Sequence, residues 1–385
     1  MDLLARQGVS MESFLYDTGL YAAMVHAIVG TFIPLIIVCM LTRFFGENRS
    51  LREGLQVWRF ALFAGLAFTI PYFTVALLLG PEFPTISGSL IGLLIVVNGA
   101  KRGWFLPREG VPWDFPHRSK WEPGWVGTIN QTEEPLPENV SLFKAWSAYI
   151  LICFLLVITR LDSLGLKKVL TSDALTIRFV NILGVEGITE SISLLYLAGT
   201  IFMLATIMTV VIYRMKPRRV GVACRDAVSR LFKPFITLIF AVALVRVFID
   251  SDVNAAGLPS MPLQLAEMIA AVTGSLWPMF AAGLGSFGSF IAGSNTVSNL
   301  MFALFQFGVA ENIGVSHAVV LGLQAVGGAA GNMITIHNIV AACATVGLVG
   351  IEGAIIRKTI IPMIYYIVFA GILGMILCSL VPGGF

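Results

Sequence analysis

Charged residues are scarce in this sequence, and one long region has no basic residues at all. Asp, Glu, Lys and Arg make up only 12% of the 385 residues, whereas 57% are hydrophobic, and residues 247–356 contain no lysine or arginine. A soluble domain of this length does not have enough interior to bury so much apolar surface. The composition therefore predicts a protein of the lipid bilayer that crosses it several times, and it makes a nucleic-acid partner unexpected.

Motifs that mark common enzymes are also absent. The chain has no GxxxxGK[ST] phosphate loop, no HExxH and no GxSxG, and its five cysteines form no CxxC pair. These absences argue against ATP hydrolysis, an intramembrane metalloprotease and an esterase. We expect the cysteines to be small buried hydrophobic residues. We therefore expect no enzymatic activity, no metal and no other cofactor.

Long apolar windows predict the transmembrane helices. A helix needs about 20 apolar residues to cross a hydrocarbon core of about 30 Å. Such windows occupy residues 22–41, 60–79, 85–100, 145–159, 192–213, 234–249, 263–282 and 359–381. The expected fold class is all-α, a polytopic transmembrane carrier in one integral membrane domain, residues 1–385. Its parts would be a first helix group (20–100), a cytoplasmic loop (101–142), a second helix group (143–250) and glycine-rich helices that bear the site (263–382).

Basic residues gather in four regions, at 43–59, 101–144, 214–233 and 357–358. Lys and Arg favour the cytoplasmic side of short loops, and alternating spans place all four regions inside. The same alternation places residues 1–21 outside, although they do not resemble a secretory signal. We therefore expect earlier helices to be missing from this chain or to be supplied by a partner.

Two polar, glycine-dense segments lie inside the region that lacks basic residues. Within a bilayer, polar side chains and free backbone amides are retained where they face protein, water or a solute. The first segment, residues 283–299, carries hydroxyl and carboxamide groups, which can bind a small carboxylate at the N-terminus of a half-helix. Its candidate substrate-binding residues are Ser294, Asn295, Thr296, Ser298 and Asn299. For the glycines before them, close helix packing is the favoured interpretation.

The second segment, residues 324–335, repeats this composition. Gln324, Gly328 and Asn332 are spaced four residues apart, so a helix would align them on one face. The glycines at 327, 328 and 331 favour a discontinuous or re-entrant helix, which is where secondary transporters usually bind their substrate. The candidate substrate-binding residues here are Gln324, Gly327, Gly328, Asn332 and Thr335.

Two ionisable residues are candidates for proton coupling. His337 follows the second polar segment directly, although a lone histidine is more often a structural hydrogen-bonding group. Glu267 lies between apolar residues, a setting that favours the protonated form of a carboxyl group.

Several stretches together resemble the L-lactate permease family. They are Gly283-x-Gly-Ser-Phe-x-x-Phe-x-Ala-Gly-Ser-Asn-Thr-Val-Ser-Asn299, Gly327-Gly-x-x-Gly-Asn-Met-Ile334, and residues 344–353 and 80–84. The resemblance implies secondary active uptake of L-lactate, glycolate or a related 2-hydroxy acid with protons across a bacterial or archaeal plasma membrane. Residues 294–296 are also similar to hairpin tips of the wider ion-transporter superfamily, whose members bind anions at two such tips and move in an elevator-like manner.

The chain departs from that family in one respect. Its members are longer, and their first half carries a Glu-Gly-Ala-Ala-Gly-Phe-Gly-type string that this sequence lacks. We therefore expect a separate chain to supply the N-terminal half, or a homo-oligomer to form. Two alternatives stay open: a dicarboxylate or inorganic-anion carrier of the same superfamily, and a truncated membrane subunit that does not transport and needs a partner chain.

Overall fold

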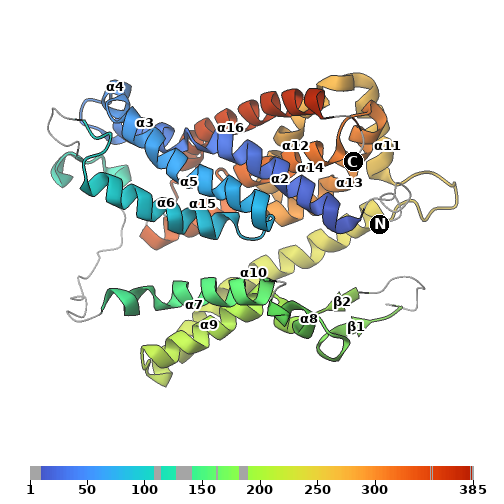
Figure 1. Ribbon diagram of the computed structural model, residues 1–385, viewed down its shortest axis with the longest axis horizontal. Helices are drawn as coiled ribbons and strands as arrows, with labels where there is room; N and C mark the ends of the chain where they lie inside the picture. The colour runs from blue at the N-terminus through green and yellow to red at the C-terminus, as the bar shows by residue number, and fades with distance from the viewer. Residues whose placement is uncertain are drawn as a thin grey trace. The chain divides into compact units, whose positions relative to one another are not determined.

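The computed structural model describes residues 10–107, 114–126, 141–161, 164–181, 190–346, 348, 350–381 and 383. Its contacts divide the chain into two compact units (Figure 1). Unit 1 comprises Met1–Asn130 and Thr237–Phe385, and unit 2 comprises Gln131–Ile236. The candidate site lies within unit 1.

The first helices of unit 1 form one layer. They are α2 (Met11–Gly30), α3 (Ile33–Phe45), α4 (Leu51–Leu55), α5 (Trp58–Leu79) and α6 (Pro84–Lys101). Ser10 caps α2, since its hydroxyl accepts a hydrogen bond of 3.1 Å from the Ser13 amide. Gly80 ends α5 with φ of 84°, and Pro84 opens α6 at a position where no amide hydrogen is needed. The short turn between them makes α5 and α6 an antiparallel pair.

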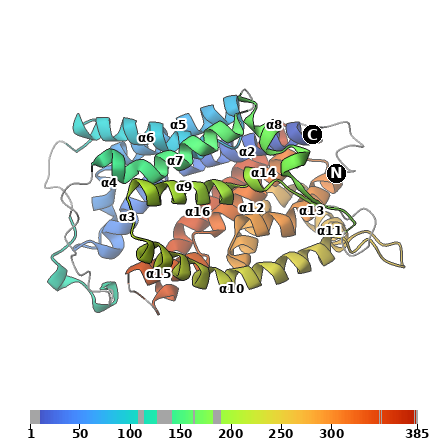
Figure 2. The ribbon, with the colours of Figure 1, turned by 90° about the horizontal axis from the view of Figure 1, so that it is seen from below.

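The later helices of unit 1 form a second layer. They are α11 (Met261–Thr273), the 3-10 turn η7 (Gly274–Leu276), α12 (Trp277–Ala292), α13 (Asn295–Ile313), α14 (His317–Gly331), α15 (Ile336–Val346) and α16 (Glu352–Leu380). Helix α2 packs against α14 and α16 and so joins the two layers, as Figures 1 and 2 show. Val25 and Val29 of α2 are buried in the same core as Val319 and Leu323 of α14 and Ala370 of α16.

Unit 2 is smaller. It contains α7 (Leu142–Arg160), α8 (Leu166–Leu170), η4 (Asp173–Leu175), β1 (Ile177–Phe179), β2 (Glu190–Ile192), η6 (Leu194–Tyr196), α9 (Ala198–Ile212) and the start of α10 (Pro217–Ile249). The two strands are antiparallel, with Arg178 opposite Ser191. The apolar window 192–213 is thus only partly helical, because its first residues belong to β2 and η6.

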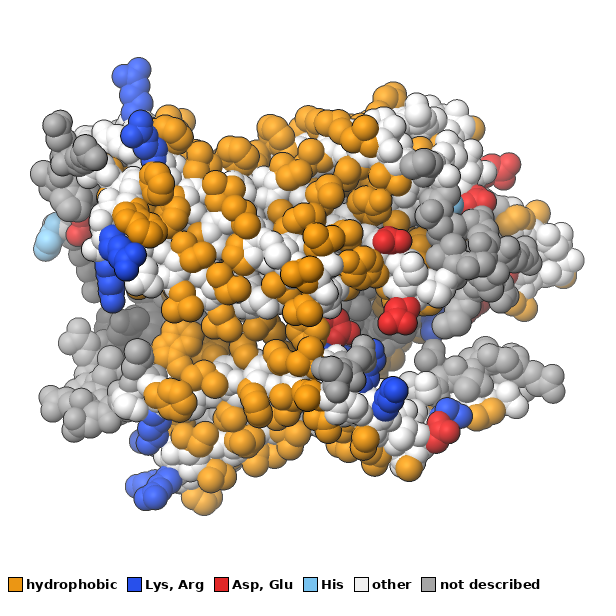
Figure 3. All heavy atoms as spheres, in the orientation of Figure 1, with side chains coloured by type: hydrophobic (Ala, Val, Ile, Leu, Met, Phe, Trp, Pro, Cys, Tyr) orange, Lys and Arg blue, Asp and Glu red, His pale blue; other side chains and the backbone are white. Residues whose placement is uncertain are grey.

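The apolar helices confirm the predicted fold class. Seven helical segments of the described residues are long and apolar enough to cross a membrane: Met11–Phe45, Trp58–Leu79, Pro84–Lys101, Phe143–Arg160, Met261–Ala292, His317–Cys343 and Glu352–Leu380. Large hydrophobic side chains such as Ile70 of α5 and Leu94 of α6 are exposed, and Figure 3 shows such side chains covering the faces of α5 and α6. In a bilayer these faces meet lipid, so the protein is an all-α, polytopic membrane protein.

Three of the four basic regions come together at one end of unit 1. The Lys358 ammonium lies 5.6 Å from the ring of Phe44, so α16 begins where α3 ends. Lys120 of the predicted cytoplasmic loop forms an ion pair with Glu47, and Arg49 forms one with Glu122. Figure 3 shows basic side chains gathered at this end of the helices. This grouping is what a shared cytoplasmic side requires.

Candidate functional site

Helices α12 and α13 form an antiparallel hairpin whose tip is Gly293–Ser294. The Ser298 hydroxyl of α13 donates a hydrogen bond of 2.8 Å to the Gly285 carbonyl of α12, and the two helices stay paired further from the tip. Gly293 has a φ of 75°, a left-handed conformation that favours glycine and allows the abrupt turn. Ser294 then caps α13 by accepting from the Val297 amide.

The tip of this hairpin meets a break between two helices. Helix α14 ends at Gly331 and α15 begins at Ile336, so residues 332–335 interrupt the helical path, as the glycine pattern predicted. A Cβ atom on Gly293 would lie only 2.8 Å from Nδ1 of His337, which follows the break. The two polar segments found in the sequence therefore come together in space.

Small residues let α12 and α14 pack with their backbones in direct contact. A Cβ atom on Gly327 would overlap the Ala282 carbonyl, and one on Gly331 would overlap the Ser286 carbonyl. Helix α12 is parallel to α14 along this contact, and such approach of small residues is a common packing mode in membranes. Gly327 thus has a packing role here, whereas Gly328 faces a different neighbour.

Asn295 has an acceptor that no donor of the described residues satisfies. Its Nδ2 donates to the Ala325 carbonyl at 3.2 Å, but its Oδ1 is buried without a hydrogen-bond partner and lies directly over Gly328. A buried acceptor left unpaired costs about 1–3 kcal/mol. Asn332, one turn further along from Gly328, accepts a hydrogen bond of 3.0 Å from the Ser289 hydroxyl. Asn295 therefore presents a carbonyl suited to a donor from a solute.

Ser298 and Gln324 belong to a closed hydrogen-bond network. Trp277 Nε1 donates to Gln306 Oε1 at 2.7 Å, and Gln306 Nε2 donates to Gln324 Oε1 at 2.9 Å. Gln324 Nε2 in turn donates to Ser298 Oγ at 3.0 Å. Ser298 and Gln306 are fully buried and Gln324 is 1% exposed. In this conformation these polar groups fasten α12, α13 and α14 together, and the sequence did not single out Trp277 or Gln306 for that role.

The tryptophan of this network provides a test of its strength. Trp277→Phe keeps an aromatic ring but removes the donor of Gln306 Oε1, which then stays buried and unpaired. We expect a loss of about 1–3 kcal/mol in unfolding free energy. Thermal melting of the purified protein measures it, with Trp146→Phe as control because that tryptophan is exposed in unit 2. Equal melting of both variants would contradict the assignment.

The remaining candidates differ in how close they lie to the tip. Thr296 is exposed, Asn299 is half-buried near Gln324, and Thr335 is buried in the break, where its hydroxyl donates to the Gly331 carbonyl at 3.0 Å. Glu267 is exposed on α11, which packs against α13 around Gly308. Gly308 is 13 residues from Asn295, about 20 Å along a helix, so the structure does not bring Glu267 to the tip.

A second polar group, missed by the sequence reasoning, lies beside the break. A cavity of about 430 Å³ is lined by residues of α2, α3, α5, α6 and α16 and by Met333 of the break. His26, near the middle of the span Met11–Phe45, lines it, and its Nδ1 lies 2.6 Å from the Tyr366 hydroxyl. Tyr72 of α5 also lines this cavity, with its ring 6.4 Å from that of His26. The signal in the sequence was a histidine inside the apolar window 22–41.

Comparisons with known proteins show which family the sequence is similar to. The family model for L-lactate permease matches residues 5–381. The chain is 31% identical to a protein of Haemophilus influenzae provisionally named an L-lactate permease, over 94% of this chain and 65% of that protein. It is 25% identical to an L-lactate permease of Bacillus subtilis, over 92% of this chain and 65% of the relative. It is 26% identical to a glycolate permease of Escherichia coli, over 83% and 58% of the two chains.

The chain thus spans about 65% of the length of the first of these relatives. No solved structure matches it. The family match covers nearly the whole chain, including both polar segments and the helix that carries His26. With its apolar helices, this chain is a multi-pass plasma-membrane protein that belongs to the L-lactate permease family.

Proposed function

We propose that this chain carries L-lactate or a related small 2-hydroxy monocarboxylate across the plasma membrane by secondary active transport, together with a proton. The names of the relatives support this substrate class, since they include L-lactate and glycolate permeases. The observation that carries the proposal is the meeting of the hairpin tip with the helix break, where Asn295 Oδ1 is buried and unpaired.

The chemistry of a 2-hydroxy acid fits these groups. Its hydroxyl can donate a hydrogen bond to Asn295 Oδ1, which satisfies the buried acceptor. Its carboxylate can accept from the first-turn amides of α13, where the helix dipole favours a negative charge. Asn332, one turn from Gly328 on the facing helix, offers a further carboxamide. A monocarboxylate without the hydroxyl lacks the group that pairs with Asn295.

The packing of the site favours one mode of alternating access. Helices α12 and α14 touch through their backbones, and the buried network fastens α13 to both. Opening the hairpin from α14 would break that network and expose several unpaired polar groups, each at a cost of about 1–3 kcal/mol. We therefore propose that α12, α13 and α14 move as one block during transport, in an elevator-like manner.

Proton coupling is assigned to histidines rather than to Glu267. His337 contacts the hairpin tip, and His26 lines the cavity beside the break, whereas Glu267 is on α11, which packs against α13 at Gly308, about 20 Å along α13 from Asn295. An imidazole ring can take up and release a proton, which a carrier coupled to protons requires.

Replacement of Asn295 tests the site directly. In vesicles that contain the purified chain, Asn295→Ala is expected to weaken uptake of labelled L-lactate by about tenfold or more at low substrate concentration, because a hydrogen-bonding partner is lost. Asn312→Ala is the matched control, since this exposed asparagine lies in the last turn of the same helix and its side chain donates to the Gly308 carbonyl. Equal uptake by both variants would refute the site, and stronger competition by succinate than by glycolate would refute the substrate class.

A further inference from the structure

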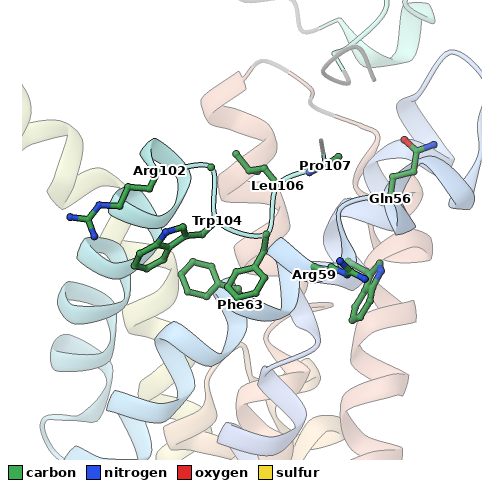
Figure 4. A pocket seen from close by; sticks show the side chains of 10 residues that line it. Gln56, Arg59, Phe63, Arg102, Trp104, Leu106 and Pro107 are labelled. Carbon is green, nitrogen blue, oxygen red and sulfur yellow. The ribbon is translucent and has the colours of Figure 1, made fainter. Parts of the chain in front are cut away.

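A second pocket lies at the basic end of unit 1, where no candidate substrate residue is found. It has a volume of about 1120 Å³ and lies between the start of α5 and the segment after α6. The described residues that line it include Arg59 and Arg102, together with Trp58, Phe63, Trp104 and Phe105. No acidic side chain is among these lining residues. Figure 4 shows Arg59 and Arg102 on either side of the aromatic side chains.

The turn after α6 explains how the pocket forms. Gly103, with φ of 71°, lets the Trp104 amide bond back to the Gly99 carbonyl at 2.9 Å and the Gly103 amide to Ala100 at 3.1 Å. This glycine-dependent ending reverses the chain at the end of the helix. Trp104 and Phe105 are thereby laid against Phe63 of α5, with ring centroids 6.2 Å and 5.2 Å away.

The two arginines differ from Arg49 and Lys120, which lie at the same end of unit 1. Arg49 and Lys120 are paired with Glu122 and Glu47. Among the described residues, neither Arg59 nor Arg102 has an acidic partner; instead, each guanidinium lies about 5.5 Å from a tryptophan ring, that of Trp58 or Trp104. A guanidinium on an aromatic face is oriented without losing its hydrogen-bond donors, which suits it to a phosphate.

The depth of the pocket points to a lipid. It lies where the candidate spans Trp58–Leu79 and Pro84–Lys101 begin and end, which is the level of lipid headgroups. Tryptophans are typical of this interface. Below it, α5 and α6 expose aliphatic side chains, among them Leu66, Ile70 and Leu94, along which acyl chains can lie. We propose that this pocket binds an anionic phospholipid, whose headgroup charge is balanced by Arg59 and Arg102.

A lipid-binding measurement on the purified full chain tests this proposal without any transport assay. The affinity for labelled phosphatidylglycerol in detergent micelles is measured for the wild type and for Arg59→Gln and Arg102→Gln. The affinity for phosphatidylcholine is measured in the same way for comparison. Each replacement is expected to lower the affinity for phosphatidylglycerol about tenfold, as expected for a charge-assisted hydrogen bond to phosphate. Arg59→Lys keeps the charge and is expected to restore part of the binding.

Two controls can overturn the proposal. Arg52→Gln removes a basic side chain that is exposed on α4 at the same end but does not line the pocket, so a smaller decrease is expected. Equal losses for Arg52→Gln and Arg59→Gln would show diffuse attraction to membrane charge and no site. In a second control, inorganic phosphate and L-lactate compete with the labelled lipid. If either displaces it as effectively as unlabelled phosphatidylglycerol, the pocket is a site for soluble anions and the proposal is refuted.

Discussion

Gly328→Ala is expected to weaken L-lactate binding strongly while leaving the protein folded. A methyl group on Gly328 would overlap the Asn295 carboxamide oxygen, which is the free end of a side chain and can swing aside. The swing removes the unpaired acceptor from the site and fills the space above Gly328. We expect the affinity for L-lactate to fall about a hundredfold, since a hydrogen bond and the space for the ligand are lost together. Ligand-induced stabilisation of the purified protein measures it without requiring transport.

Two other glycines separate this effect from packing. Gly327→Ala directs its methyl group at the Ala282 backbone, which cannot swing aside, so it is expected to destabilise the fold by about 1–3 kcal/mol or more. Gly283→Ala has open space around its Cβ and is expected to leave both stability and binding unchanged. If Gly328→Ala unfolds the protein as readily as Gly327→Ala, or binds L-lactate like Gly283→Ala, Asn295 is not the ligand that we propose.

The fold class followed from composition, and the interruption after α14 followed from glycine spacing. Scarce charge and long apolar windows are sufficient to predict membrane helices, because the bilayer demands them independently of tertiary contacts. The glycines at 327, 328 and 331 favoured a discontinuous helix because glycine weakens a helix, and the structure interrupts the helix just after them, at residues 332–335. That these two segments meet was expected only from the family resemblance, because it depends on how α12 and α14 pack.

The roles of individual polar residues were harder to predict. Ser298 and Gln324 have the same side-chain chemistry as a substrate ligand, but the structure uses them to bond α13 to α14 with Gln306. Hydrogen-bond partners of this kind come from different helices, so a linear sequence does not distinguish a closed network from an open site. The window 192–213 shows a related effect: uniform apolarity predicts burial or lipid contact, but it does not decide where a helix begins.

His26→Gln is expected to uncouple protons from lactate movement. His26 lies mid-span, and Tyr366 of α16 and Tyr72 of α5 are the titratable groups that face it from the helices packed around its cavity. No Asp, Glu, Lys or Arg is among the described residues that line that cavity. A neutral histidine can accept from the Tyr366 hydroxyl, and a protonated one can donate to it, so the 2.6 Å contact can be kept in both states. Glutamine can still form a hydrogen bond with the Tyr366 hydroxyl, but its side chain does not take up and release a proton during transport.

The uncoupling is visible when two modes of transport are compared in the same vesicles. Net lactate uptake should no longer be accompanied by proton movement in His26→Gln, whereas exchange of labelled for unlabelled lactate should continue, since exchange needs no net proton transfer. His117→Gln is the control, because that histidine is exposed outside the candidate spans and bonds to Ser119. Proton movement that persists in His26→Gln but is lost in His337→Gln would instead place the proton at the hairpin tip, where the ring of His337 touches Gly293.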